Sequence, residues 1–103
     1  MPMQLLISSD DEDEVWLFER TARQLKKEYG HTEAEAVNLV NGYYKKFTDP
    51  VFCSSYDLSV QTAEFFHREE SLSMADRVQF YEAMGNAPDE QAFIQWQRAR
   101  RLR

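Results

Sequence analysis

Apolar side chains recur at helical spacing near the start of the chain, and this regularity constrains the fold more than any other feature. Five of them follow one another at intervals of three, four, three and four residues: Val15, Phe18, Ala22, Leu25 and Tyr29. That spacing places them on one face of an α-helix, as a stripe that must be buried. Gly30 follows in the position that commonly ends a helix. We therefore predict a helix over residues 11–29.

Two further signals mark helix beginnings. Thr32 and Glu35 match the capping box, in which the threonine hydroxyl and the glutamate carboxylate each accept a backbone N–H. Apolar residues at helical spacing follow, which predicts a helix over residues 33–47. Asp49 followed by Pro50 is typical of an N-cap and the first helical position, so a short helical turn should begin there.

Three more helical segments are expected in the second half of the chain. The first covers residues 60–69, and the second should be capped by Ser71 or Ser73 and end before Gly85. The last begins near Pro88, and strand-type alternation is essentially absent from the sequence. These patterns predict an all-α fold, a compact bundle of four main helices plus one or two short helical turns.

Length and composition fit one folded unit. The chain has 103 residues, of which 43% are hydrophobic, enough for a modest core. We interpret residues 1–103 as a single helical domain, with an extended N-terminal arm at 1–10 and a basic C-terminal end at 98–103. Cys53 is the one cysteine and lies in an apolar stretch, which predicts a buried structural thiol. No apolar run approaches the roughly 20 residues of a membrane span, so we expect a cytoplasmic protein that does not enter membranes.

Acidic residues outnumber basic ones by 18 to 12, which gives a formal net charge of −6. This balance argues against a surface built wholly for nucleic acid or anionic lipid. Five acidic residues are consecutive: Asp10, Asp11, Glu12, Asp13 and Glu14. They fall at the start of a predicted helix, where the helix dipole favours negative charge. The same run would also steer a basic partner, and both interpretations stay open.

Adjacent aromatic residues point to a partner surface. Neighbours on a helix point about 100° apart, so both members of such a pair do not fit one narrow core stripe. We predict that the bundle leaves aromatic anchors accessible near Tyr43, Phe65 and Phe80, for a partner protein or a second copy of the chain. The alternative is that the central helices are covered on both sides.

A metal site is one alternative function. Glu64, His67 and Glu70 lie one helical turn apart on one face. Carboxylate and imidazole groups bind zinc or iron, so this face would centre a metal-dependent enzyme or a metal-binding helical protein. A single helix does not close a metal site, however, and a solvated polar face explains the same residues. His31 has no nucleophile fixed near it by spacing, and we predict no catalytic residue and no cofactor.

A cluster of basic residues is the second alternative. Four arginines lie in the last six residues: Arg98, Arg100, Arg101 and Arg103. Such a cluster is typical of nucleic-acid contacts, although the acidic remainder of the chain would repel phosphate. Cations also stabilise the C-terminal end of a helix. A third interpretation is that the cluster attracts the acidic run across the fold or between protomers.

The favoured function is that of a small, acidic, non-enzymatic module that binds a basic protein. Within this class we expect an inhibitor, an immunity-type protein or an adaptor. The chain shares its size and acidity with small immunity and antitoxin proteins, although no motif supports a closer comparison.

Overall fold

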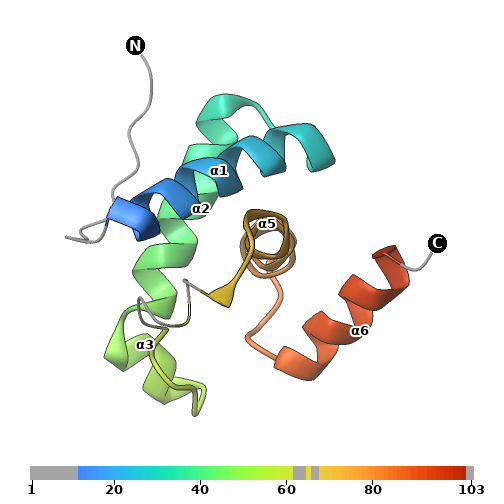
Figure 1. Ribbon diagram of the computed structural model, residues 1–103. Helices are drawn as coiled ribbons and strands as arrows, with labels where there is room; N and C mark the ends of the chain where they lie inside the picture. The colour runs from blue at the N-terminus through green and yellow to red at the C-terminus, as the bar shows by residue number, and fades with distance from the viewer. Residues whose placement is uncertain (1–11, 62–64, 66–67, 102–103) are drawn as a thin grey trace.

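A computed structural model describes residues 12–61, 65 and 68–101 of the chain. The elements in this part are α1 (Glu12–Tyr29), α2 (Glu33–Phe47), α3 (Pro50–Ser55), α5 (Ser71–Val78), the π-helical segment η1 (Gln79–Ala83) and α6 (Glu90–Arg101). The predicted all-α compact bundle is confirmed, with α3 as a short helical turn. Figure 1 shows α5 between the pair formed by α1 and α2 and the more distant α6. None of the described helices is long and apolar enough to span a membrane.

The predicted beginnings of α2 and α3 are also confirmed. The backbone N–H of Glu35 donates to Thr32 Oγ1 at 3.2 Å, and the N–H of Thr32 donates to Glu35 Oε1 at 3.1 Å. Gly30, which ends α1, has a φ of 70°, a left-handed conformation that glycine adopts without steric cost. Asp49 caps α3 by accepting a backbone N–H, and Pro50 is the first residue of that helix. These signals involve neighbours in sequence, so the fold as a whole does not override them.

The helix predicted over 60–69 is wrong at its beginning. Gln61 is not helical, and its N–H donates to the carbonyl of Phe47 at 2.9 Å. This bond to the end of α2 holds the connecting segment against the preceding helix. In the remainder of the predicted range Phe65 and Arg68 are helical, as expected, and residues 62–64 and 66–67 lie outside the described part of the chain.

The predicted cap of α5 is wrong as well. Glu70 occupies the N-cap position, and no side-chain capping bond is found among the described residues. Ser73 does not cap the helix, because its hydroxyl donates to Glu69 Oε2 at 2.9 Å. Ser71 is buried as the first residue of the helix. Both serines therefore lie inside the first turn of α5.

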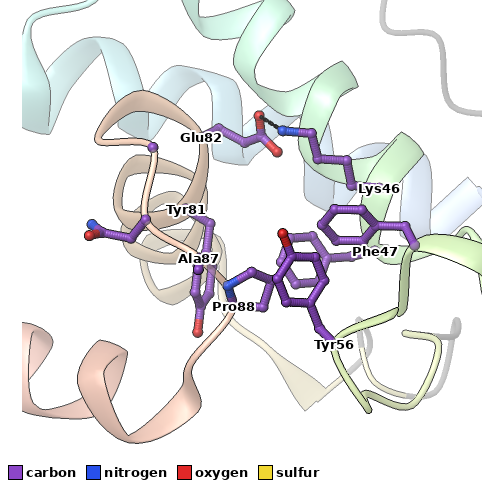
Figure 2. Close-up of a pocket in the computed structure, with 10 residues that line it drawn as sticks. Lys46, Phe47, Tyr56, Tyr81, Glu82, Ala87 and Pro88 are labelled. Atoms are coloured by element: carbon purple, nitrogen blue, oxygen red, sulfur yellow. Dashed lines mark hydrogen bonds and ion pairs between the residues drawn. The ribbon is translucent and has the colours of Figure 1, made fainter. Parts of the chain in front are cut away.

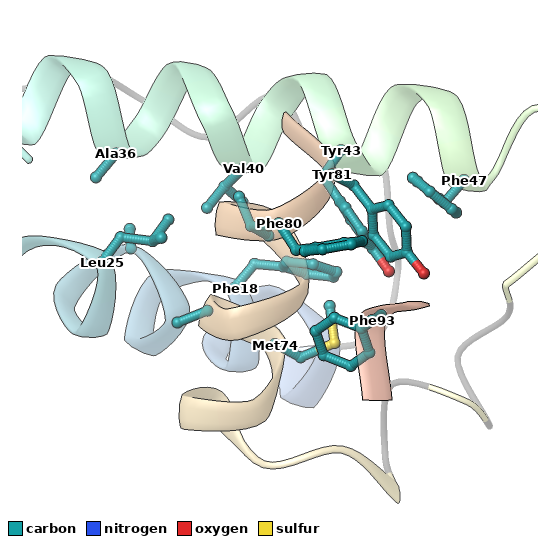
Figure 3. Close-up of a cluster of buried hydrophobic side chains, with 13 residues drawn as sticks. Phe18, Leu25, Ala36, Val40, Tyr43, Phe47, Met74, Phe80, Tyr81 and Phe93 are labelled. Atoms are coloured by element: carbon teal, nitrogen blue, oxygen red, sulfur yellow. The ribbon is translucent and has the colours of Figure 1, made fainter. Parts of the chain in front are cut away.

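The core fills the space where α1, α2, α5, η1 and α6 meet (Figure 3). The predicted stripe of α1 contributes Phe18, Ala22 and Leu25, all buried, whereas Val15 and Tyr29 at its two ends are half-buried. Large side chains from the other elements complete the cluster: Val40, Tyr43, Phe47, Met74, Val78, Phe80, Tyr81 and Phe93.

The prediction that Tyr43 and Phe80 are accessible anchors is wrong, because both side chains are buried. The ring of Phe80 lies 5.3 Å from that of Trp96 in α6. The ring of Tyr81 lies 5.3 Å from that of Phe47 in α2. The segment that carries the adjacent pair is therefore covered by α6 on one side and by α2 on the other, which is the alternative that the sequence left open.

Candidate binding pocket

A concavity with aromatic walls, of about 250 Å³, lies between the end of α2, α3 and the connection from η1 to α6. Its lining includes Lys46, Phe47, Phe52, Tyr56, Tyr81 and Glu82, together with the loop 85–88. Figure 2 shows these lining residues, with the pair formed by Lys46 and Glu82 at one end. Segments far apart in sequence thus build one site.

The aromatic rings form a connected wall. The ring centres of Phe47 and Phe52 lie 5.7 Å apart in an edge-to-face arrangement, and those of Phe52 and Tyr56 lie 5.1 Å apart. Phe47 and Tyr81 are buried, so they make the floor of the pocket, whereas Tyr56 is exposed at its edge. Such a wall offers flat apolar surface on which a planar group stacks.

The loop that closes the pocket is held by backbone geometry and a side-chain bond. Gly85 has a φ of 70°, which ends the helical segment there. The side-chain amide of Asn86 donates to the carbonyl of Phe80 at 3.0 Å. Pro88 then fixes the chain just before α6. The loop is therefore an ordered wall of the pocket.

Glu82 supplies the polar end of the pocket. Lys46 Nζ donates to Glu82 Oε2 at 3.2 Å, and the two side chains are 48% and 10% exposed, respectively. The other oxygen, Oε1, is buried and has no hydrogen-bond partner among the described residues. Gly42 gives this carboxylate its room, because a Cβ there would lie 3.2 Å from Glu82 Oε2.

Three large apolar side chains are exposed on lining residues of the pocket or on their direct neighbours in sequence. Tyr56, a lining residue, is 46% exposed. Val51 and Met84 each precede a lining residue and are 77% and 49% exposed. We refer to Val51, Tyr56 and Met84 as the rim residues. Large apolar side chains that are exposed on the segments forming a concavity are typical of a protein-interaction surface.

The predicted acidic run is only partly within the described chain. Glu12, Asp13 and Glu14 form the first turn of α1, as expected for negative charge at a helix N-terminus. Asp10 and Asp11 lie outside the described residues. The docking role of the run therefore stays a prediction.

The third predicted aromatic anchor, Phe65, is half-buried. The guanidinium carbon of Arg77 lies 5.3 Å from the centre of its ring. Phe65 is thus packed against the fold, and it is absent from the wall of the described pocket. Its use as a partner anchor remains a prediction.

The predicted metal site falls mostly outside the described chain. Glu64 and His67 are not described, and Glu70 is exposed at the beginning of α5. Among the residues that the structure describes, no three His, Cys, Asp or Glu side chains are placed to hold a metal ion. The metal alternative draws no support from these residues.

The arginine cluster is partly engaged inside the fold. Arg101 donates to the carboxylates of Asp76 and Glu28, and the guanidinium of Arg100 lies 4.3 Å from the ring centre of Tyr29. Arg98 is exposed, and Arg103 lies outside the described residues. The basic end thus pairs with carboxylates of α5 and of the last turn of α1, and these described partners do not belong to the acidic run.

Two buried charged residues of α5 were missed by the sequence reasoning. Asp76 and Arg77 are adjacent in sequence and both are buried. Arg77 donates to both carboxylate oxygens of Glu90 at 2.8 Å. Hydrogen bonding to Glu90 raises the pKa of Arg77 even though burial opposes it. No local signal reveals such residues, because their partners lie in another helix.

The remaining polar candidates have structural roles. Cys53 is buried, and its Sγ donates to the carbonyl of Phe47 at 3.5 Å. Burial raises the pKa of the thiol above its usual range, so the prediction of a buried structural cysteine is confirmed. His31 Nε2 lies 2.7 Å from Gln79 Oε1, which connects the turn after α1 to η1.

Comparison with known proteins adds no assignment to this geometry. No protein-family model, no curated protein and no solved structure matches the chain. The pocket, the rim residues and the charge of the chain are therefore the basis for proposing a function.

Proposed function

We propose that this protein is a non-enzymatic module that binds a basic protein partner through the aromatic pocket and its rim. The observation that carries the proposal is the combination of exposed apolar rim residues with a pocket that ends in a carboxylate. Apolar side chains supply most of the binding energy in such interfaces, and a charged group in a pocket selects the partner.

The overall charge supports a basic partner. The chain carries a formal net charge of −6, and the acidic run adds a concentrated source of negative potential. Complementary charge accelerates encounter and disfavours acidic competitors. An inhibitor, an immunity-type protein or an adaptor would all use a surface of this kind, and we propose the inhibitor as the first role to test.

The experiment is capture from a native lysate with the immobilised full chain. The variant replaces the rim by Val51→Ser, Tyr56→Ser and Met84→Ser, all exposed positions whose substitution leaves the core intact. Trp16→Ser is the matched control, because Trp16 is an exposed aromatic residue on α1, a helix that does not line the pocket. Circular dichroism confirms that each variant is folded.

We expect wild type and Trp16→Ser to capture the same basic proteins and the rim variant to lose them. Equal capture by the rim variant would contradict the proposal. Light scattering tests the chain as its own partner. A rim-dependent dimer with no captured protein would replace the basic partner by a second copy of the chain.

A further inference from the structure

The carboxylate of Glu82 has only part of its hydrogen-bonding capacity used. A carboxylate accepts several hydrogen bonds, and here Lys46 Nζ donates one to Oε2 at 3.2 Å. Oε1 is buried without a hydrogen-bond partner among the residues described, on a side chain that is 10% exposed. A buried charged oxygen without a donor is costly, so this site favours any ligand that brings one.

Lys46 is a replaceable partner of this carboxylate. Its side chain is about half exposed, and an ion pair with one solvated member contributes little to stability. The ammonium sits on a flexible stem and is strongly hydrated, so it returns to water at small cost. Displacement of Lys46 would leave both oxygens of Glu82 without a donor among the described residues.

A guanidinium group matches what the pocket then offers. It is planar and presents paired N–H donors that bind both oxygens of a carboxylate at once. Its flat face stacks on aromatic rings, and Tyr56 and Phe52 provide such rings in the lining of the same pocket. Figure 2 shows the hydroxyl end of Tyr56 directed toward the end of the pocket that holds Lys46 and Glu82.

A lysine side chain fits less well. Its ammonium would only repeat the point contact that Lys46 already makes, and it lacks the planar fork that spans two oxygens. An uncharged amide would supply donors but would leave the carboxylate charge uncompensated. The chemistry of the pocket therefore selects a guanidinium over both.

We infer that the pocket receives an arginine side chain of the basic partner, with Glu82 as its carboxylate ligand and Lys46 as a displaceable internal counterion. This inference rests on the proposed function, since it names the group through which the partner is recognised. It also assigns opposite effects on binding to two residues that form one ion pair.

The test is an NMR titration of the full chain with N-acetyl-arginine methylamide. Two matched probes accompany it. The citrulline analogue has a similar shape to arginine but no charge, and the lysine analogue has the charge but lacks the planar guanidinium. We expect the arginine probe to bind about tenfold more tightly than citrulline, equivalent to about 1.4 kcal/mol. Shifts should centre on the ring of Tyr56. Equal affinity for arginine and citrulline would overturn the inference.

Variants of the ion pair provide the decisive comparison. Glu82→Gln should weaken arginine binding about tenfold, because the amide keeps the shape but loses the charge. Lys46→Met should strengthen binding by roughly threefold, because it removes the competing cation. Lys45→Met is the matched control on the same helix and should change nothing. A merely structural pair would weaken binding in both variants, so weaker binding by Lys46→Met contradicts the inference even if Glu82→Gln fails to fold.

The two proposals fail in distinguishable ways. If arginine does not bind but the rim variant still loses captured proteins, the arginine pocket is wrong and the protein-binding function stands. If arginine binds with the expected variant effects but capture is independent of the rim, the proposed partner surface is wrong.

Discussion

Arg101, in the last turn of α6, donates from two nitrogens to the two oxygens of the buried carboxylate of Asp76 in α5. Asp76 also accepts from the hydroxyl of Tyr29 at 2.6 Å and from the amide of Gln97 at 3.0 Å. One carboxylate therefore joins α1, α5 and α6. A buried charge with this many donors is fully compensated and fixes how α6 sits on the bundle.

Asp76→Ala tests this network. The substitution removes the acceptor of three side chains and leaves Tyr29 and Arg101 without their shared partner. We expect the free energy of unfolding to fall by about 3 kcal/mol, the scale for breaking a buried ion pair. Urea denaturation followed by circular dichroism measures it. Arg98→Ala, at an exposed position of α6, is the control and should change stability by less than about 0.5 kcal/mol. A comparable loss in both variants would contradict the network.

The sequence predicts those interactions whose partners lie a few residues apart, and it does not predict those whose partners lie in another helix. The capping box of Thr32 and Glu35 involves residues three apart, so the pattern alone predicts it. The burial of Asp76 and Arg77 depends on partners in α6, and no spacing rule reaches that far. Phe80 was misplaced for the same reason, because α6 covers it.

Patterns among neighbouring residues in the sequence also do not predict the candidate pocket. Its walls come from the end of α2, from α3 and from the loop 85–88, which the sequence keeps apart. One signal was available, since Gly42 lies inside a predicted helix where glycine is unfavourable. The structure explains that glycine by the close approach of Glu82.

Arg77 tests the other end of α6. Its guanidinium lies 4.6 Å from the ring centre of Phe93 and pairs with the carboxylate of Glu90. We expect Arg77→Ala to lower the free energy of unfolding by about 2–4 kcal/mol, because it removes both the packing and the charge. Arg77→Met should lose clearly less, since its apolar stem still covers Phe93. Equal losses in urea denaturation would show that the ion pair, and not the packing, dominates.

Buried tyrosines predict alkaline instability. Burial raises the pKa of Tyr81 from 10.0 to about 12, with a smaller contribution from Glu90, and burial also raises the pKa values of Tyr29 and Tyr43. The folded state thus favours the neutral phenol, so this stabilisation is complete below pH 10 and is lost as the pH rises toward 12. Stability measured across this range should fall steeply. Tyr81→Phe should reduce the slope, and an unchanged slope would contradict this prediction.

Neutralising the acidic run separates its two interpretations. The variant carries Asp10→Asn, Asp11→Asn, Glu12→Gln, Asp13→Asn and Glu14→Gln. If the run steers the partner, association measured by surface plasmon resonance should slow by about tenfold at low salt and approach the wild-type rate at high salt. If it only complements the dipole of α1, thermal stability should fall by about 0.3–1 kcal/mol per charge near the terminus while the association rate stays unchanged.

Gly42 tests whether the close approach of Glu82 has a cost in helix stability. Alanine in a helix interior is usually more stable than glycine by about 0.5–1 kcal/mol. In the wild-type background we expect Gly42→Ala to gain less than this, because the new methyl group would lie 3.2 Å from Glu82 Oε2 and displace the carboxylate from Lys46. In a Glu82→Ala background the full gain should appear in urea denaturation. An equal gain in both backgrounds would show that the Glu82 carboxylate does not require glycine at position 42. The polar end of the pocket would then tolerate a side chain at this position of α2.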